Sequence, residues 1–306
     1  MSTATLSPSN PQTLNELFGR DNQIQFEEGP GESPIARLRF ADQEATISLY
    51  GGHVLSYSVK EEAPILWVSE QAIYRDGKAI RGGIPVIWPW FGAHPDDASK
   101  PSHGFARTSD WEVKSTSLTE DSHPQICLLL QKDGATYAQW PHSFRLELTI
   151  TLGKGLVVDM KVINTGNGPF DFTGALHTYF NVSDISKVKV HGLEDSLYFD
   201  QLDQMAVKSQ MGPISFDAEF DNIYFDTLST CRLVDNGFDR EILVEKRGSK
   251  STVVWNPWID KARRMSDFGD EEYQSMVCIE TANAGPDLIT LNPGGQHILG
   301  TTIRLG

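Results

Sequence analysis

Residues 144–166, FRLELTITLGKGLVVDMKVINTG, decide the fold class of this 306-residue chain. Across residues 144–152 every second residue is apolar, and Arg, Glu and Thr occupy the positions between them. Successive side chains of a β-strand point to opposite faces, so this period of two is typical of a strand with one buried face. A second strand-like run begins at residue 156, directly after Gly-Lys-Gly at 153–155. The segment therefore predicts an antiparallel hairpin with its tip at these three residues.

Similar runs extend from this hairpin towards both ends of the chain. Upstream, from residue 23, QIQFEE, ARLRF, ATISLY and HVLSYSV alternate or run apolar between Gly, Pro and Asp. Downstream, the runs continue through DFTGALHTYFNV, STVVWN and MVCIETA to HILGTTIRL near the C-terminus. More than a dozen such runs predict an all-β fold. A large antiparallel β-sandwich of two sheets fits that number better than a small barrel does.

Helical signals are confined to two places, so we expect only a few short helices. Asn10 and Pro11 supply an N-cap and a first-turn proline before a short run that Gly19 ends. Residues 258–268 are the second helical candidate. We expect Trp258 to pack on the sheet and Arg263 and Arg264 to be solvated.

No linker, repeat or break in composition divides the chain after its N-terminus. Residues 1–9 are expected to be a disordered tail rich in Ser, Thr and Pro. We therefore predict a tail and short helix over residues 1–22 and a single β-sandwich domain over residues 23–306. Nowhere do 18 apolar residues follow one another, and the N-terminus does not resemble a signal peptide, so we expect a soluble, cytoplasmic protein.

The net charge is −15, from 26 basic and 41 acidic residues. Nucleic acids and anionic membranes bind basic patches, so neither is expected as a partner. A few arginines in a cleft can still bind a small anion, because remote charges are screened over about 8–10 Å. The three cysteines, Cys127, Cys231 and Cys278, are widely spaced and form no C-x-x-C pair. Neither a disulfide framework nor a zinc site is indicated.

Residues 81–107, RGGIPVIWPWFGAHPDDASKPSHGFAR, combine arginines, histidines and aromatic residues in a segment with no helical period. Connecting loops rarely expose large aromatic side chains, so its two tryptophans and two phenylalanines must be buried or form the floor of a site. Arginines among aromatic rings suit a concave site for an anion or a polyol, because the rings offer apolar faces and the guanidinium groups offer fixed donors. A core loop whose arginines cap backbone carbonyls is an equally good interpretation.

Two residues in strand-like runs are candidates for proton transfer. His177 lies in GALHTYF, and Glu280 ends the apolar run MVCIE. A carboxylate there costs several kcal/mol to bury unless it is paired or used. The alternative interpretations are a satisfied core histidine and an ordinary surface glutamate. His103 and Asp221 are further polar residues between aromatic ones. With no nucleophile, metal or phosphate-loop motif in the sequence, an imidazole and a carboxylate point to acid–base chemistry on a sugar.

Six segments, in this order, resemble the aldose 1-epimerase (galactose mutarotase-like) superfamily: RGGIPVIWPWFG, HGFAR, GALHTYF, FDNIY, VVWNPW and MVCIETAN…LNPG. They span roughly residues 80–300 and look most like the glucose-6-phosphate 1-epimerases, also called D-hexose-6-phosphate mutarotases. The resemblance implies a galactose mutarotase-like supersandwich with an open cleft on one sheet and no cofactor. It also implies interconversion of the α and β anomers of a hexose 6-phosphate.

The resemblance assigns roles position by position. The family's catalytic acid falls on His177 and its catalytic base on Glu280. Its sugar- and phosphate-contacting positions fall on four residues: Arg81, His103, Arg107 and Asp221. Two positions depart from the family and are expected to alter the pocket. Ser102 stands where relatives often carry Gln, and Trp90 stands where they often carry a smaller or polar residue.

Other functions stay open on the residues alone. A glycoside hydrolase would use two carboxylates, such as Glu280 and Asp221. A mutarotase for an unphosphorylated hexose, or a carbohydrate- or phosphosugar-binding protein without turnover, would use the same cleft. The expected partner is a small sugar phosphate, and the expected assembly is a monomer or a weak homodimer.

Overall fold

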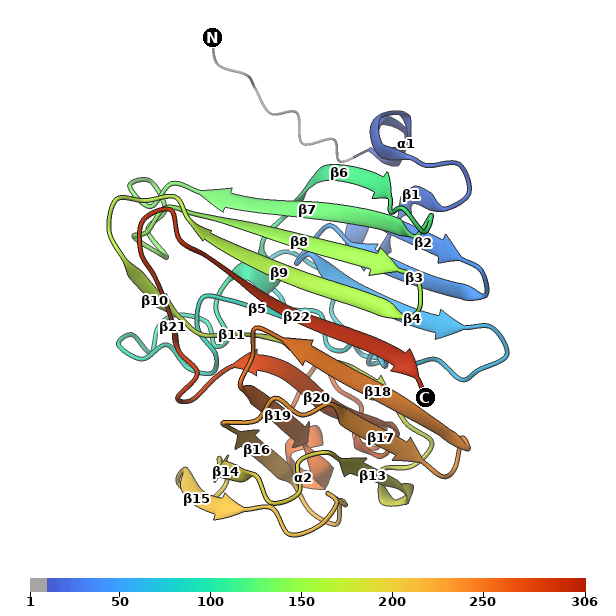
Figure 1. Cartoon of the computed structure of the whole chain (residues 1–306), viewed down its shortest axis with the longest axis vertical. Coiled ribbons are helices and arrows are strands. Elements are labelled where there is room, and N and C mark those ends of the chain that lie inside the picture. Colours follow the sequence, from blue (N-terminus) through green and yellow to red (C-terminus); the bar gives the residue numbers. More distant parts are fainter. Residues whose placement is uncertain (1–9) are drawn as a thin grey trace.

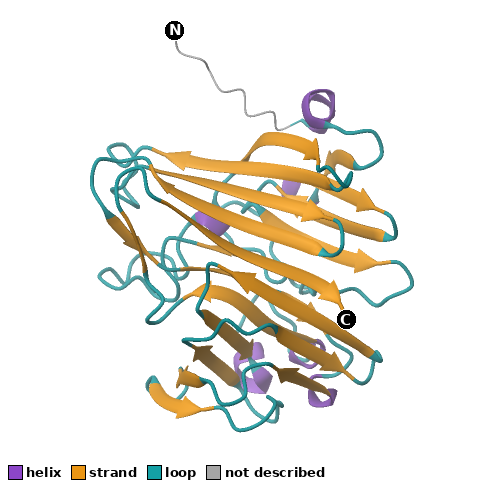
Figure 2. Cartoon of the chain, in the orientation of Figure 1, coloured by secondary structure: helices purple, strands orange, loops and turns teal. Residues whose placement is uncertain are grey.

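The computed structural model describes residues 10–306, so the disordered tail expected for residues 1–9 lies outside the described residues. Strands make up most of the regular structure, and all pairings between them are antiparallel. Figure 1 shows one long sheet lying in front of the others, and Figure 2 shows how few helices accompany the strands (Figures 1 and 2). The prediction of an all-β antiparallel sandwich with a few short helices is confirmed.

The front layer is a sheet of eight strands built around the predicted hairpin. In spatial order its strands are β13 (Val188–His191), β17 (Cys231–Asp235), β18 (Arg240–Arg247), β22 (Gln296–Leu305), β9 (Leu156–Asn164), β8 (Phe144–Leu152), β7 (Pro124–Lys132) and β6 (Glu112–Leu118). Leu152 pairs with Leu156 across the Gly-Lys-Gly tip, as the sequence predicts.

The rear layer contains two further sheets. The first has the order β1 (Ile24–Glu28), β2 (Pro34–Phe40), β3 (Gln43–Ser48) and β4 (His53–Val59). The second has the order β15 (Ala206–Ser209), β14 (Leu197–Asp200), β16 (Phe220–Tyr224), β19 (Ser251–Asn256), β20 (Met276–Asn283), β11 (Gly174–Leu176) and β5 (Val86–Ile87), while β12 (Tyr179–Asn181) also pairs with β20. A separate two-stranded sheet pairs β10 (Phe170–Phe172) with β21 (Ile289–Leu291).

The first predicted helix is confirmed, and the second is shorter than expected. Helix α1 (Pro11–Phe18) begins after Asn10, whose side chain accepts a hydrogen bond from the Gln12 backbone N–H. Helix α2 (Trp258–Ala262) was expected to continue to Phe268. It ends earlier because the chain turns to bury Phe268 against Trp67, with ring centroids 5.1 Å apart.

Four short 3-10 helices complete the helical structure: Pro30–Glu32, Ala106–Thr108, Ile185–Lys187 and Glu272–Ser275. Across residues 10–306, every helix is too short or too polar to span a membrane.

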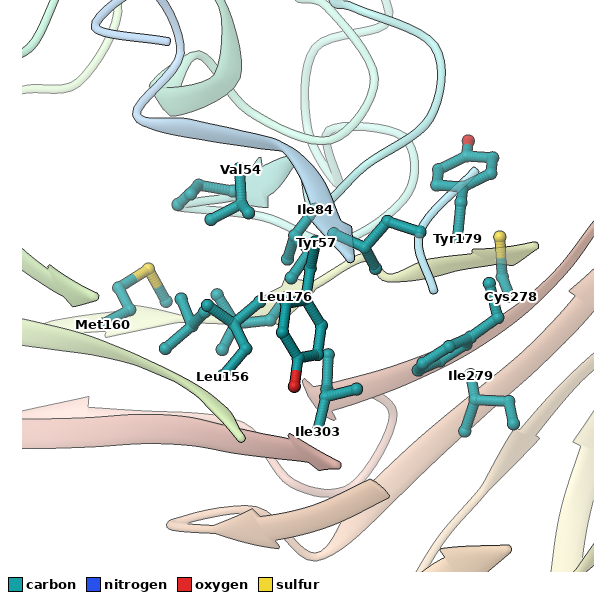
Figure 3. Packing of buried hydrophobic residues seen from close by; sticks show 14 of the residues in the cluster. Val54, Tyr57, Ile84, Leu156, Met160, Leu176, Tyr179, Cys278, Ile279 and Ile303 are labelled. Atoms are coloured by element: carbon teal, nitrogen blue, oxygen red, sulfur yellow. The ribbon is translucent and has the colours of Figure 1, made fainter. Parts of the chain in front are cut away.

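The core lies between the two layers. Figure 3 shows Leu156 and Ile303 of the front sheet in the same hydrophobic cluster as Val54, Leu176 and Ile279 of the rear layer. All five side chains are at most 1% exposed. Removing a side chain of this kind from water contributes about 1.5–3 kcal/mol. This core fixes which face of each rear strand points away from the front sheet.

Strand β20 is buried on both of its faces. Ile279 belongs to the main core, whereas Ala282 belongs to a separate apolar cluster with Val253. Side chains alternate along a strand, so Glu280 points to the same outer face as Ala282. The fold therefore places a carboxylate on a side of the sheet that loops cover.

The segment that follows residue 81 joins the two parts of the rear layer. The Ile84 backbone N–H donates to the Val54 carbonyl of β4 at 2.9 Å. On its other side, the Tyr179 and His177 backbone N–H groups donate to the carbonyls of Gly83 and Pro85, at 2.9 and 3.1 Å. This segment therefore acts as an additional, irregular strand between β4 and the second sheet.

The loop over residues 81–107 closes on itself at Gly104. The Phe105 backbone N–H donates to the Trp88 carbonyl at 3.0 Å, and Gly104 has a φ of +70°. A Cβ atom on Gly104 would lie 1.9 Å from the Trp88 carbonyl oxygen. Only glycine fits this position without displacing backbone.

We expect Gly104→Ala to lower the free energy of unfolding more than the control Gly212→Ala. Both glycines have a φ of +70°, so both variants bear the cost of left-handed backbone, about 1–2 kcal/mol. Gly212 is surrounded by open space, whereas Gly104 meets backbone atoms. The difference between the two variants in the free energy of unfolding, measured in urea, therefore gives the cost of the steric clash at Gly104. Equal losses of stability would show that the loop absorbs the added methyl group.

Candidate functional site

A cavity of about 320 Å³ lies over the outer face of the second rear sheet. Seven of the eight residues that the sequence singles out line it: Arg81, Ser102, His103, Arg107, His177, Asp221 and Glu280. They come from positions far apart in the chain, and the sheet brings them together. The cavity wall also includes Gln201, Trp255, Lys261 and Met265.

Strand register explains why these side chains share one face. Glu280 of β20 pairs with Val253 of β19, and Trp255 of β19 pairs with Asp221 of β16. Directly opposed residues of antiparallel strands point to the same side of the sheet. Side chains two residues apart on a strand point to the same face, so Val253 and Trp255 share one face. Asp221, Trp255 and Glu280 therefore all reach the cavity.

His177 and Glu280 meet at the floor of this cavity. His177 Nε2 lies 3.3 Å from Glu280 Oε1, and the two side chains are only 10% and 2% exposed. His177 stands between β11 and β12, which both pair with β20, and this pairing brings it beside the carboxylate. His177 Nδ1 and Glu280 Oε2 have no hydrogen-bonding partner within residues 10–306. One ring nitrogen of His177 and one carboxyl oxygen of Glu280 thus form no hydrogen bond to residues 10–306.

Burial shifts the two pKa values of this pair in opposite directions. It lowers the pKa of His177 well below its usual range, and the nearby His103, Arg107 and Arg81 lower it further. It raises the pKa of Glu280 well above its usual range, and Asp221 acts in the same direction. Both shifts disfavour the charged forms, so burial favours a neutral pair in the free protein, with one shared proton held by Glu280 rather than by His177.

Arg81 is held by groups of the protein itself. Asp267 Oδ2 accepts hydrogen bonds from Arg81 Nε at 3.3 Å and from Nη2 at 3.1 Å. Arg81 Nη1 donates to the Tyr179 hydroxyl at 3.1 Å. Burial lowers the pKa of Arg81, but Tyr179 and Asp267 outweigh burial and leave that pKa above its usual value. This guanidinium is therefore a fixed and largely neutralised cation.

Arg107 differs from Arg81 because it forms no ion pair with any residue of 10–306. Its Nη2 donates to the Ser102 backbone carbonyl at 2.8 Å. Burial lowers the pKa of Arg107 to about 10, so the side chain is still a cation at neutral pH. A partly buried cation without a carboxylate partner gains from pairing with an anionic ligand.

His103 stands beside Arg107 as a neutral donor. Burial lowers the pKa of His103 to about 3, with Arg107 and Arg81 adding to the effect. The Gly92 backbone N–H donates to His103 Nδ1 at 3.2 Å, so the ring proton sits on Nε2. Ser102 contributes its backbone carbonyl to Arg107 and lines the cavity.

Asp221 belongs to a polar group at another part of the wall. It accepts hydrogen bonds from Gln201 Nε2 and from Lys261 Nζ, the latter at 3.4 Å. Lys261 also pairs with Glu219 at 3.0 Å and lies 5.7 Å from the centroid of the Trp255 ring. An aromatic face beside fixed donors and acceptors suits a sugar ring with its hydroxyl groups.

Trp90 is the one predicted contact residue that the structure places elsewhere. It is not part of the cavity lining, and its ring is 4% exposed. Its indole N–H donates to the Pro101 carbonyl at 2.9 Å, and its ring packs against His94 and Phe105. Trp90 therefore stabilises the loop rather than forming the pocket wall, because its large apolar ring is removed from water by packing within the loop. The expectation that Trp88 and Phe105 are buried is confirmed.

Sequence reasoning missed four residues of the site: Tyr179, Trp255, Lys261 and Asp267. Trp255 and Tyr179 could have been found from alternation, since each shares a face with residues already chosen. Lys261 lies in helix α2 and Asp267 lies in the irregular chain that follows it, and the sequence did not indicate that either side chain reaches the site. Within residues 10–306, no group of three or more His, Cys, Asp or Glu side chains could hold a metal ion.

Comparison with known proteins places this site in a family. A protein from Cenchrus ciliaris, described as "Putative glucose-6-phosphate 1-epimerase", is 39% identical over 261 residues, which cover 82% of this chain and 78% of that protein. A protein from Escherichia coli K12 with the same description is 36% identical over 241 residues, covering 79% of this chain and 80% of that one.

A solved structure from Salmonella typhimurium, described as a "putative mutarotase", has the same fold. It superposes with a TM-score of 0.86 at 28% identity and covers 96% of this chain and 98% of its own. The family model for aldose 1-epimerase matches residues 36–304, which include all of the cavity residues named above. The resemblance drawn from the six sequence segments is thus confirmed, and this chain belongs to the aldose 1-epimerase family.

Proposed function

We propose that this enzyme interconverts the α and β anomers of a hexose 6-phosphate, with glucose 6-phosphate as the first candidate. The observation that carries the proposal is the 3.3 Å contact between His177 Nε2 and Glu280 Oε1 in a cavity that also contains Arg107. Family membership and the descriptions of the two relatives support the same reaction.

The proposed mechanism is acid–base ring opening and closure. Glu280, as carboxylate, takes the proton from the anomeric hydroxyl, while His177 gives a proton to the ring oxygen. The bond between C1 and the ring oxygen breaks, and an open-chain aldehyde forms. Rotation about the bond between C1 and C2 presents the other carbonyl face, and the two residues exchange roles during closure. The pair begins and ends with one proton, so the cycle needs no external acid or base.

A bound phosphate favours the protonation state that this mechanism needs. In the empty cavity, the cations Arg81 and Arg107 contribute to the low pKa of His177. A phosphate dianion near these cations offsets their charge and so raises the pKa of His177. The shared proton then moves from Glu280 to His177 when substrate binds.

Arg107 is the proposed main phosphate contact. Arg81 already pairs with Asp267 through two of its nitrogen atoms, whereas Arg107 donates to a backbone carbonyl. Guanidinium groups bind phosphate oxygens with parallel hydrogen bonds, and a free guanidinium gains more from this than a neutralised one. His103 Nε2–H is a second proposed donor to the substrate.

The two-carboxylate alternative is less well supported by this geometry. The nearest titratable partner of Glu280 is the imidazole of His177 at 3.3 Å, whereas a glycoside hydrolase relies on two carboxyl groups. We further propose that residues 23–306 work as one domain, since the site draws on both halves of this range. Monomeric or weakly dimeric assembly and a cytoplasmic location stay predictions.

We expect Glu280→Gln and His177→Ala each to lower kcat by about 10²–10⁴-fold, because each removes one proton-transfer group. Anomer exchange of glucose 6-phosphate, followed by NMR exchange spectroscopy with the uncatalysed rate subtracted, measures this. Asp235→Asn is the matched control, because Asp235 is also a buried carboxylate but does not line the cavity. Near-normal exchange in both site variants would remove the role assignment.

Arg107→Ala should raise KM for glucose 6-phosphate far more than KM for free glucose. The variant loses the unpaired cation that the phosphate is proposed to contact. Arg240→Ala provides the control, since the Arg240 guanidinium also donates to backbone carbonyls, but outside the cavity. KM is measured for both sugars with all three proteins. The same change for both sugars would exclude a phosphate-specific role for Arg107.

The pH profile of kcat/KM, which reports the pKa values of the free enzyme, should be bell-shaped with a broad plateau through neutral pH. On the acid side, activity falls when the pair takes up a second proton, and the lowered pKa of His177 moves this limb well below pH 6.5. On the alkaline side, activity falls when the pair loses its last proton, and the raised pKa of Glu280 moves this limb well above pH 4.5.

Free glucose is the substrate of choice for this measurement, because a phosphate monoester itself titrates near pH 6. The uncatalysed rate is subtracted at each pH. A profile that drops on the acid side at the usual histidine pKa would contradict the low pKa of His177.

A further inference from the structure

The His177 ring lacks a hydrogen bond that would fix its orientation. Its Nδ1 atom is buried and without a hydrogen-bonding partner in the part of the chain described here, residues 10–306. Its Nε2 atom faces Glu280. An imidazole that transfers protons is normally oriented by a hydrogen bond at the nitrogen opposite its reactive partner. The plane of this ring must therefore be held by packing.

Tyr179 provides this packing. The ring centroids of Tyr179 and His177 are 4.8 Å apart, and their planes differ by 11°. The Tyr179 ring is 2% exposed and also stacks on Trp67, with centroids 5.7 Å apart and planes 22° apart. The Trp255 and Tyr179 rings are nearly perpendicular, with centroids 6.0 Å apart and planes 82° apart. The tyrosine ring cannot tilt without moving a packed neighbour.

The Tyr179 hydroxyl is fixed in turn by Arg81 and Asp267. Arg81 Nη1 donates to this hydroxyl at 3.1 Å, and Asp267 accepts from Arg81 Nε and Nη2. The Arg81 and Asp267 side chains are 23% and 18% exposed, so water screens their contact only in part. A planar guanidinium held by several hydrogen bonds has little freedom to rotate. Contacts thus run without a gap from Asp267 to His177.

We propose that Asp267 and Tyr179 are positioning residues for His177. Asp267 holds the Arg81 guanidinium, Arg81 holds the Tyr179 hydroxyl, and the Tyr179 ring holds the plane in which His177 meets Glu280 and the sugar. This inference rests on the proposed proton-transfer role of His177 and extends it to two residues outside the cavity lining. It also gives Arg81 a role in catalysis that is separate from any contact with phosphate.

The proposal is tested with Tyr179→Phe and Asp267→Asn, which remove one hydrogen-bonding group each and keep the size of the side chain. A displacement of about 1 Å at a reacting group costs on the order of 10²-fold in rate, so kcat should fall by about 10- to 100-fold. For Tyr179→Phe, KM for glucose 6-phosphate should stay within about twofold, because the substrate contacts are intact.

Tyr224→Phe is the matched control. Tyr224 is fully buried in the same sheet, and its hydroxyl donates to Gln210 Oε1 at 2.7 Å, away from the cavity. Removing this hydroxyl measures how far the loss of a buried hydroxyl group lowers stability when the site is left intact. We expect this variant to lose thermal stability and to keep kcat.

The double variant Tyr179→Phe with Asp267→Asn separates positioning from general damage. If both residues act through Arg81, the loss in kcat for the double variant should be close to that of the worse single variant. Independent structural defects would instead multiply the two losses. A multiplied loss would overturn the proposed chain of contacts.

A spectroscopic measurement separates this proposal from the proposed function. The ring ¹⁵N resonances of His177, identified by their absence in His177→Gln, are recorded without substrate. We expect them to shift in Tyr179→Phe and in Asp267→Asn and to stay in place in Tyr224→Phe. Unchanged resonances and a control-like kcat in the first two variants would overturn the proposal. Full activity of His177→Ala would refute the proton-transfer role, while the resonances would still report whether the ring is positioned.

Discussion

The pairing of β20 with β11 and β12 is the constraint on which the site depends. It places an imidazole and a carboxylate side by side on a sheet face that solvent barely reaches. Neither group tolerates such burial alone, because an unpaired buried charge costs several kcal/mol. Sharing one proton makes the pair neutral, and a neutral pair can be buried.

The cations around this pair differ in whether a nearby carboxylate neutralises them. Arg81 is neutralised by Asp267, and Lys261 is neutralised by Glu219 and Asp221. Arg107 is the cation of the cavity lining that lacks a carboxylate partner within residues 10–306. A sheet face that held three unpaired cations would destabilise the fold. Pairing two of them leaves a single positive group to distinguish an anionic ligand from a neutral one.

Much of the fold followed from the sequence because its physical basis is local. The period of two in residues 144–152 and the Gly-Lys-Gly tip indicated the central hairpin directly, and Asn10 with Pro11 indicated helix α1. Local pattern did not reveal which strand would lie beside which. The position of β5 next to β11, and the use of residues 82–85 as an additional strand, depend on long-range pairing that leaves no periodic trace.

The residues of the candidate site also divide into those that local sequence pattern indicated and those that it did not. His177 and Glu280 were recognisable because a polar residue within an apolar strand needs an explanation, and Arg107 was recognisable among aromatic residues. Trp90 misled for the converse reason, since a tryptophan in a loop can equally cover a pocket or fill a core. Asp267 could not be foreseen, because an aspartate in an irregular connection is usually a turn residue. Its significance arises only when Arg81, far away in sequence, folds against it.

The connection between β19 and β20 supplies both Lys261 and Asp267. Lys261 lines the cavity, and Asp267 holds the Arg81 guanidinium at its wall. One insertion or deletion in this connection would thus alter both the cavity wall and the support of Arg81. For protein engineering or natural divergence, this makes the connection a compact unit of variation within an otherwise unchanged sandwich.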